Sequence, residues 1–176
     1  MNQEEARILL FTGDGKGKTT AALGMVLRAS GHGMRSLIIQ FLKGNAATGE
    51  IAGCRHLPGV EIVQKGRGFV PKPDSSLFVE HKRAAKEALE MASQALASRE
   101  FDLVVLDEIC TAVAKGLLEE EQVIGAIRKG GPETSVVLTG RNASPGLTSL
   151  ADTVTEMRCI QHGLSSGRKA QKGVEF

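Results

Sequence analysis

A glycine-rich stretch at residues 11–20, F-T-G-D-G-K-G-K-T-T, holds the residues best suited to chemistry. Its glycines allow backbone N–H groups to converge on an anion, and the helix that should follow points its positive end at the same place. Lys18 can reach the outer phosphates of a nucleotide, and the Thr19 hydroxyl is placed to hold Mg²⁺. The stretch matches G-x-x-x-x-G-K-[ST], except that Thr12 takes the first glycine position and Gly13 follows it. It therefore predicts a loop that binds a nucleoside triphosphate.

The alternative is a surface loop that happens to be rich in glycine and lysine. Such a loop would not need the apolar run that precedes it, Arg7–Phe11, or the helix-forming Ala21-Ala22-Leu23 that follows it. The flanks favour a strand, a phosphate loop and a helix in succession.

Two carboxylates, Asp107 and Glu108, follow four apolar residues, which is the Walker-B arrangement of a strand-end acid facing phosphates and metal. Mg²⁺ prefers oxygen ligands and keeps several waters, so one or two carboxylates, Thr19 and the phosphates would suffice. A helix cap or a surface acidic pair is the alternative. Arg141 is a candidate contact for the triphosphate, although a lone arginine is more often a surface charge.

Strand and helix signals alternate along the chain. Short apolar runs predict strands at 7–12, 36–41, 60–64, 102–107, 135–139 and 153–158. Helices are predicted at 18–30, 76–98, 119–129 and 145–150, with a helical turn near 49–54. Ser75 or Ser76 should cap the long helix, whose core stripe would be Leu77, Ala84, Ala88, Met91 and Ala95.

This alternation predicts an α/β fold in a single domain, residues 1–176, with a mainly parallel six-stranded sheet and helices on both faces. The loops that follow the strands should then share one rim, where ligands bind. Residues 65–74, K-G-R-G-F-V-P-K-P-D, cannot be regular structure and should expose Phe69. Composition alone favours a solvated connector there.

Composition excludes several classes of protein. A net charge of +2 is too small for a bulk nucleic-acid binder, and the longest apolar runs are strand-sized, which predicts no membrane span. The polar N-terminus does not resemble a secretory signal. The three cysteines are widely spaced and form no metal-binding pattern, so we expect reduced thiols in a cytoplasmic protein.

Further motifs resemble one family, the P-loop type ATP:corrinoid adenosyltransferases. Beside T-G-D-G-K-G-K-T-T-A-A stand I-I-Q-F-L-K-G, then G-F, V-V-L-D-E and T-G-R-N-A, followed by L-A-D-T-V-T-E-M and the closing G-R-K-A-Q-K-G-V-E-F. They span nearly the whole chain in the family's order, and the shortened phosphate loop is itself a feature of the family.

The resemblance implies a RecA-like P-loop NTPase fold and transfer of the 5′-deoxyadenosyl group of ATP to Co(I) of a reduced corrinoid, with release of tripolyphosphate. It implies that ATP lies reversed in the loop, with C5′ facing the corrinoid. The nucleophile is then the cobalt itself, and no side-chain nucleophile is required. The protein must align the two reactants and stabilise the leaving group.

Carried over residue by residue, the resemblance assigns roles to the motif residues. Lys18 neutralises the phosphates as a catalytic residue, and Asp14 replaces the family's more usual Asn and would contact the nucleoside. The metal, Mg²⁺ or Mn²⁺, would be held by Thr19, Asp107 and Glu108. The ATP site would comprise Gly13, Asp14, Gly15, Lys16, Gly17, Lys18, Thr19, Thr20, Arg28 and Arg141.

The resemblance also gives the connector a role. Family members shield the lower face of the corrin with aromatic side chains, which removes the lower axial ligand and eases reduction of Co(II). Phe69 matches the first aromatic and is implied as a catalytic, corrinoid-binding residue. Pro71 stands where the second, a Trp, is usual, and only six residues precede the first strand, whereas longer members have an N-terminal extension.

The implied partners are ATP, a reduced corrinoid, an electron-donating flavoprotein such as flavodoxin, and a second copy of the chain; no nucleic acid or membrane is expected.

Two other functions remain open on the sequence. One is a RecA-like ATPase or small-molecule kinase acting on the γ-phosphate; the other is a nucleotide-switched binding module with a basic connector and tail. The small net charge argues against the latter.

Overall fold

The computed structural model describes residues 5–45, 48–163 and 167–174. Six strands, all paired in parallel, form one sheet in the order β3-β2-β4-β5-β1-β6. The strands are β1 (Arg7–Thr12), β2 (Ser36–Gln40), β3 (Val60–Gln64), β4 (Leu103–Asp107), β5 (Ser135–Thr139) and β6 (Thr153–Glu156). The expected α/β fold with a parallel six-stranded sheet is confirmed.

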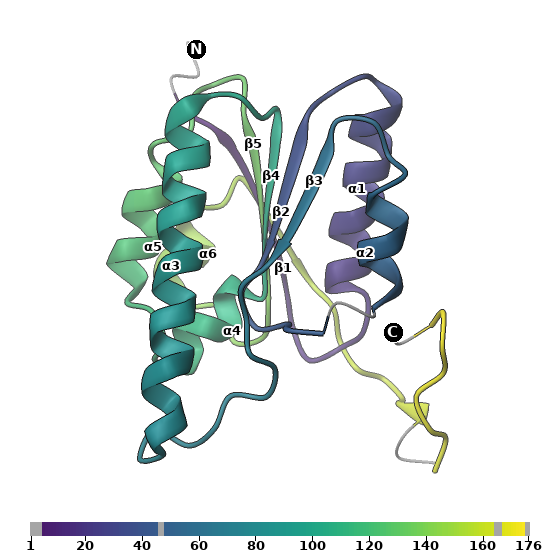
Figure 1. The fold of residues 1–176 in the computed structure, drawn as a ribbon, viewed down its shortest axis with the longest axis vertical. Coiled ribbons are helices and arrows are strands. Elements are labelled where there is room, and N and C mark those ends of the chain that lie inside the picture. Colours follow the sequence, from purple (N-terminus) through teal and green to yellow (C-terminus); the bar gives the residue numbers. More distant parts are fainter. Residues whose placement is uncertain (1–4, 46–47, 164–166, 175–176) are drawn as a thin grey trace.

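Helices cover both faces of this sheet (Figure 1). One face carries α3 (Ser76–Ser98), α4 (Ile109–Ala114), α5 (Glu120–Ile127) and α6 (Pro145–Leu150), and the other carries α1 (Lys18–Gly31) and α2 (Gly49–Cys54). Within the described residues, no helix combines the length and the apolar character needed to cross a bilayer.

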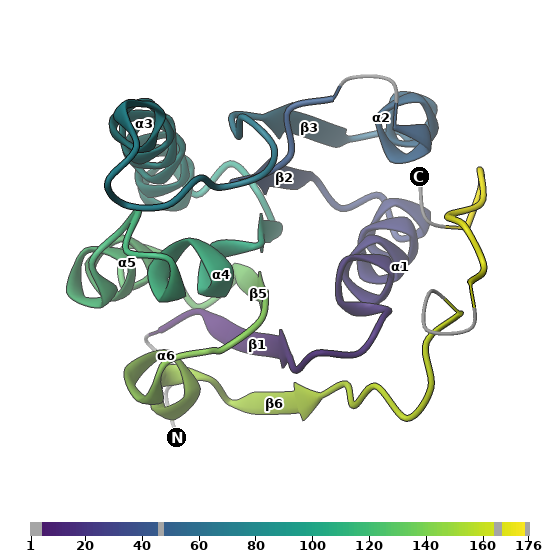
Figure 2. The same cartoon turned by 90° about the horizontal axis from the view of Figure 1, so that it is seen from below.

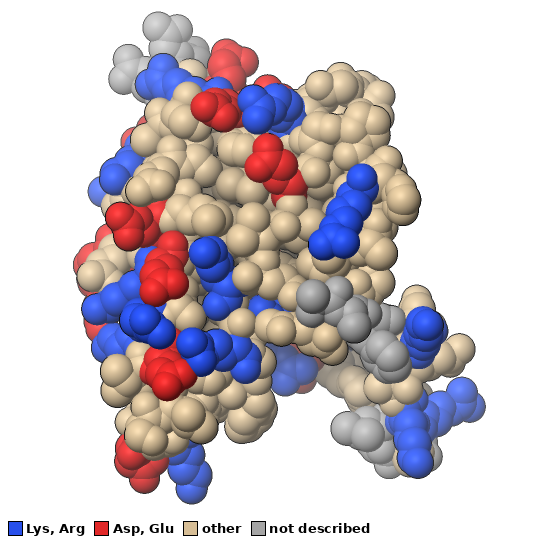
Figure 3. All heavy atoms as spheres, viewed as in Figure 1, with Lys and Arg blue, Asp and Glu red and all other residues tan. Residues whose placement is uncertain are grey.

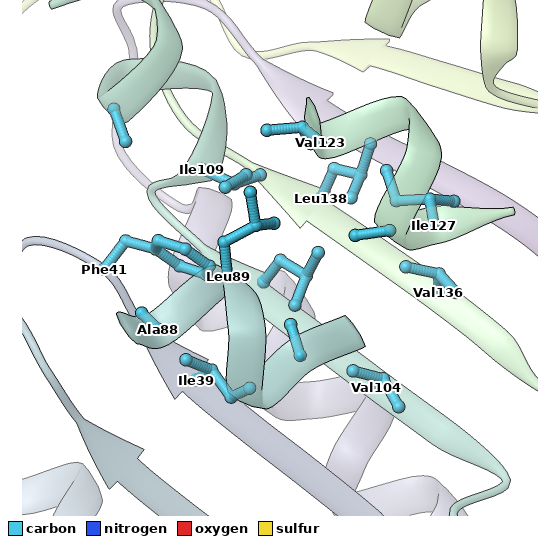
Figure 4. Close-up of a cluster of buried hydrophobic side chains, with 14 of the residues drawn as sticks. Ile39, Phe41, Ala88, Leu89, Val104, Ile109, Val123, Ile127, Val136 and Leu138 are labelled. Atoms are coloured by element: carbon cyan, nitrogen blue, oxygen red, sulfur yellow. The ribbon is translucent and has the colours of Figure 1, made fainter. Parts of the chain in front are cut away.

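The strands alternate their side chains between two apolar cores, as a sheet buried on both faces requires. Ile39, Val104 and Val136 join the core beneath α3 and α5, which Figure 4 shows. Their neighbours Ile38, Val105 and Val137 join the core beneath α1, together with Ala22, Val26 and Ala29 of that helix. On the outer side of α3, positive and negative side chains are interspersed (Figure 3).

The register brings the ends of the strands level at one rim. Gln40 pairs with Asp107, Phe11 with Thr139, and Thr12 with Glu156. Figure 2 views the molecule from this rim, where the loop after β1, helix α4 and the connector between β3 and α3 are all exposed to view.

The element bounds predicted from the sequence agree with the structure within two residues, but one helix was not predicted and one core residue was assigned wrongly. Helix α4 was not foreseen, because its sequence, I-C-T-A-V-A, is short and carries no capping residue of the usual kind. Leu77 does not belong to the core stripe of α3: it is 56% exposed, because the first turn of the helix projects beyond the ends of the strands (Figure 1). The deeply buried positions that the sequence reading missed are His81, Ala85, Leu89, Ala92 and Leu96.

Candidate nucleotide-binding site

The glycine-rich loop connects β1 to α1 and packs closely against the chain that leaves β6. Gly13 has φ +96°, and a Cβ at this position would lie 2.3 Å from the carbonyl oxygen of Met157. The N–H of Gly15 donates to the same carbonyl at 2.7 Å. Gly17 is the N-cap of α1 with φ 118°. The glycines therefore allow both the left-handed turns of the loop and its contact with the segment after β6.

Lys18, the first residue of α1, is buried and bends back over its own loop. Its Nζ donates to the carbonyl oxygens of Gly13 at 2.7 Å and Gly15 at 2.6 Å. Burial lowers the pKa of Lys18, more strongly than the nearby Glu108 carboxylate raises it. The ammonium is thus held at the loop by weak carbonyl acceptors, which a phosphate oxygen can replace with a stronger charge-assisted bond.

Asp107, at the end of β4, is fully buried and accepts hydrogen bonds from the ends of two other strands, β2 and β5, and from α1. Its Oδ1 accepts from the hydroxyls of Thr19 and Thr139, each at 2.8 Å. Its Oδ2 accepts from Nε2 of Gln40 at 3.0 Å and lies 3.7 Å from Nζ of Lys43. Asp107 therefore sits behind the cavity wall and fixes the Thr19 hydroxyl at it.

Glu108, by contrast, lines the cavity. It adopts φ 66° as the N-cap of α4, a conformation uncommon for a residue with a Cβ. Its backbone N–H donates to the Thr139 hydroxyl at 2.8 Å, and its carboxylate accepts from the Thr111 hydroxyl at 2.5 Å. Helix α4 thereby orients the carboxylate that the Walker-B pattern predicted.

The cavity is also lined by a lysine and a glutamate that were not predicted from the sequence as site residues. Lys43 follows β2, Glu50 lies in the first turn of α2, and Nζ of Lys43 donates to Oε1 of Glu50 at 2.8 Å. Burial opposes the charge of Lys43, but the carboxylates of Asp107 and Glu50 outweigh it and raise the pKa of Lys43. Burial likewise opposes the charge of Glu50, and the bond from Lys43 outweighs it and lowers the pKa of Glu50. Only the position of Lys43 after an apolar strand could have indicated its place.

The cavity enclosed by these residues has a volume of about 650 Å³. The expected residues that line it are Asp14, Gly15, Lys16, Gly17, Lys18, Thr19, Thr20, Glu108 and Arg141. Arg141 is placed by its backbone N–H, which donates to the Thr111 hydroxyl at 2.9 Å. Gly13 contributes through its carbonyl to Lys18.

The C-terminal tail closes one side of the cavity, which sequence reasoning missed. His162, Gly173 and Val174 line it, and Nζ of Lys16 donates to the Val174 carbonyl at 2.7 Å. Figures 1 and 2 show the tail leaving β6 and passing beside α1. Asp14 accepts from the backbone N–H of Cys159 at 3.1 Å, and this bond is the main cause of its lowered pKa.

Asp107 and Gly13 reach this cavity through Thr19 and Lys18, but two other predicted site residues lie away from it. Phe69 is 94% exposed on the connector. Arg28 lies in the last turn of α1, about 15 Å along the helix from Lys18. It borders a separate cavity of about 170 Å³ with Met34 and Asp102. The described chain therefore does not bring Arg28 to the phosphate loop.

Oxygen ligands suited to Mg²⁺ lie at the cavity wall. The hydroxyl of Thr19 and the carboxylate of Glu108, which line the cavity, and the carboxylate of Asp107 behind it are hard donors of the kind Mg²⁺ prefers. Within the part of the chain that the structure describes, no group of three or more His, Cys, Asp or Glu side chains could hold a metal alone. A metal here would depend on Thr19 and the phosphates, as in other phosphate-loop sites.

The comparison with solved structures supports the fold. The KaiC-like protein PH0186 from Pyrococcus horikoshii OT3 superposes with a TM-score of 0.56 over 90% of this chain and 75% of that chain, at 16% identity.

The sequence comparisons show the family. Residues 4–176 match the family described as ATP:corrinoid adenosyltransferase BtuR/CobO/CobP. A corrinoid adenosyltransferase of Pseudomonas aeruginosa is 44% identical over 98% of this chain and 85% of its own length. Those of Escherichia coli K12 and Salmonella typhimurium are each 38% identical over 98% and 99% of this chain, and 87% of their own lengths. The chain belongs to the ATP:corrinoid adenosyltransferase family.

Proposed function

We propose that this protein transfers the 5′-deoxyadenosyl group of ATP to the cobalt of a reduced corrinoid, releasing tripolyphosphate in the formation of adenosylcobalamin. The observation that carries the proposal is a phosphate-loop cavity, lined by Lys18, Glu108 and Arg141, in a chain of this family. The protein is a transferase on this proposal, and residues 1–176 act as a single catalytic domain.

The bond changes explain why the proposed mechanism needs no side-chain nucleophile. Co(I) donates an electron pair to C5′ of ATP, a cobalt–carbon bond forms, and the bond between C5′ and its phosphate oxygen breaks. The electron pair of that bond leaves with tripolyphosphate. The chain therefore has two tasks, which are to align cobalt and C5′ and to stabilise the growing charge of the leaving group.

The cavity residues fit the second task. The backbone N–H groups of the loop would donate to the phosphates, and the positive end of the α1 dipole would attract them. Lys18 would exchange its carbonyl acceptors for phosphate oxygens, and Arg141 would approach from the end of β5. Thr19, oriented by Asp107, and Glu108 would hold Mg²⁺ directly or through water, and the metal would add charge neutralisation at the triphosphate. Asp14 would contact the nucleoside side.

The connector fits the first task. The connector between β3 and α3 lies on the same rim as the phosphate loop (Figure 2), and the exposed Phe69 on it is free to cover an apolar ring. We propose that it packs against the corrin, with Pro71 beside it in place of the family's Trp. A flavoprotein such as flavodoxin would supply the electron, the enzyme would act in the cytoplasm, and a homodimer would be its working form.

Product analysis tests the proposal. The purified protein is incubated with ATP, Mg²⁺ and a chemically reduced corrinoid; the cobalt–carbon bond is followed by its absorbance and the released phosphate is identified. Tripolyphosphate in equal amount to adenosylated corrinoid is the expected result. Orthophosphate without a cobalt–carbon bond would instead favour a γ-phosphate ATPase or kinase.

A further inference from the structure

The Lys43–Glu50 pair lies on the cavity wall that neither the phosphate loop nor the Walker-B strand provides. Lys43 follows β2 and Glu50 begins α2, and both side chains line the nucleotide cavity. The pair is mostly buried, since the side chains are 33% and 13% exposed. An ion pair of this kind is therefore part of the site and not of the outer surface.

The position of Lys43 is fixed by acceptors on two elements. Its Nζ lies 2.8 Å from Oε1 of Glu50 and 3.7 Å from Oδ2 of Asp107. Gln40 holds the same Oδ2 at 3.0 Å and is itself held by Gln64 at 2.8 Å. An ammonium has three N–H donors, so the bond to Glu50 leaves Lys43 able to donate into the cavity as well.

Several cationic side chains line the nucleotide cavity, and Lys43 is one of them. Lys18 approaches from the phosphate loop, Arg141 from the end of β5 and Lys43 from the end of β2. All three residues line the cavity in which a triphosphate would bind. A leaving tripolyphosphate gains charge as the bond to C5′ breaks, so it needs neutralisation from more than one side.

We propose that Lys43 binds the tripolyphosphate leaving group directly, and that Glu50 holds its ammonium at the wall until the nucleotide arrives. This inference rests on the proposed function and adds a leaving-group contact from outside both nucleotide motifs. Lys43 would donate from the part of the wall that follows β2, and a phosphate oxygen would take the place of Glu50 as its main acceptor.

The alternative is a purely structural role, that of a strut, in which the ion pair only holds α2 against the chain that follows β2. The two roles predict different results when each partner of the pair is replaced in turn. A strut is lost equally with Lys43→Gln and with Glu50→Gln. A leaving-group contact is lost only with Lys43→Gln, whereas Glu50→Gln removes a competitor and a negative charge from the wall.

The test measures binding of tripolyphosphate, with Mg²⁺ and without corrinoid, to the purified full chain by calorimetry. Lys43→Gln should weaken binding about tenfold, the value of one charge-assisted hydrogen bond. Glu50→Gln should tighten it by up to about fivefold through the lost repulsion. Lys82→Gln is the matched control, because Lys82 on α3 also pairs with a glutamate, Glu119, at 4.0 Å, and neither residue lines the nucleotide cavity. The affinity of this variant should equal that of the wild type.

Weaker binding in both Lys43→Gln and Glu50→Gln, or wild-type binding in Lys43→Gln, would overturn the proposal. A second measurement needs no variant: tripolyphosphate should protect Lys43 of the wild type from acetylation, read by peptide mass spectrometry, and leave Lys82 unprotected. Equal acetylation of Lys43 with and without the anion would also overturn it. These results are independent of corrinoid chemistry, whereas failure of the proposed function would appear as orthophosphate in the wild-type product analysis.

Discussion

The two halves of the catalytic rim are built in different ways. On the nucleotide side, Asp107 is fully buried and is hydrogen-bonded to Thr19, Thr139 and Gln40. On the connector side, Phe69 is 94% exposed, although the backbone around it is fastened to the chain at the end of β2, for example by Gly68 N–H to the Leu42 carbonyl at 2.7 Å. The first half is held by buried hydrogen bonds before any ligand binds, whereas the second presents an apolar side chain to solvent.

This difference has a physical basis. Charge development on a leaving group is best stabilised by dipoles that need no reorganisation, which favours a rigid, hydrogen-bonded cradle. A large, flat corrin ring must enter and leave, which favours an apolar side chain that is exposed at the surface. Substitutions on the two sides should therefore affect different measurements.

The largest effect should come from Lys18→Ala. It removes the cation nearest the phosphates, and we expect adenosyl transfer to fall by about 100- to 1,000-fold. ATP affinity, measured by calorimetry without corrinoid, should fall as well, because the lost contact is to the nucleotide. Lys86→Ala, on the outer side of α3, serves as the control. Near-normal turnover in Lys18→Ala would mean that the loop does not hold the triphosphate.

A backbone change tests the rigidity of the same side. Gly13→Ala places a Cβ 2.3 Å from the Met157 carbonyl at φ +96°. We expect a loss of about 1–3 kcal/mol in the free energy of unfolding, measured with urea, together with weaker ATP binding. Gly24→Ala is the matched control, since a Cβ there meets nothing within 4 Å and the residue lies inside α1. It should stabilise the protein by up to about 1 kcal/mol. Equal effects of the two changes would contradict the close packing of the loop.

The same contrast explains what the sequence could predict. The strands and the phosphate loop follow from local signals, namely apolar runs, glycines and the strand-end acids, and they lie where expected. Contacts between distant segments left no local signal. Lys43, Glu50 and His162 reach the cavity because of how β2, α2 and the tail are arranged. Arg28 shows the opposite error. The family resemblance assigned it to the ATP site, but it lies in the last turn of α1, away from the phosphate loop.

Phe69→Ala should produce a smaller effect, confined to the connector side. We expect the free energy of unfolding to change by less than about 0.5 kcal/mol, because the side chain makes little contact with the chain. ATP affinity should stay unchanged. Adenosylation that starts from Co(II) with a reductase should fall about tenfold, the value of one aromatic contact. Val79→Ala, which alters another exposed apolar residue, should leave it unchanged. An equal fall with chemically supplied Co(I) would show that Phe69 positions the corrinoid and does not tune its reduction.

The smallest expected effect is the pH dependence of the Lys43–Glu50 pair. The pKa of Glu50 is lowered from its ordinary value of 4.5: burial opposes this, but the Lys43 bond outweighs it. A carboxylate whose pKa is lower in the folded state stabilises the protein above the unfolded pKa, and this contribution is lost as pH falls through the folded pKa. Glu50→Gln should therefore be less stable than the wild type at pH 7 by about 0.5–1.5 kcal/mol, and the difference should disappear toward pH 3. Urea unfolding at pH 7, 5 and 3 measures it. A difference that stayed constant across this range would show that Glu50 contributes by packing alone. The rigidity of the phosphate-binding site would then come from the hydrogen bonds of Asp107. The Lys43–Glu50 ion pair would not stabilise the position of α2 electrostatically.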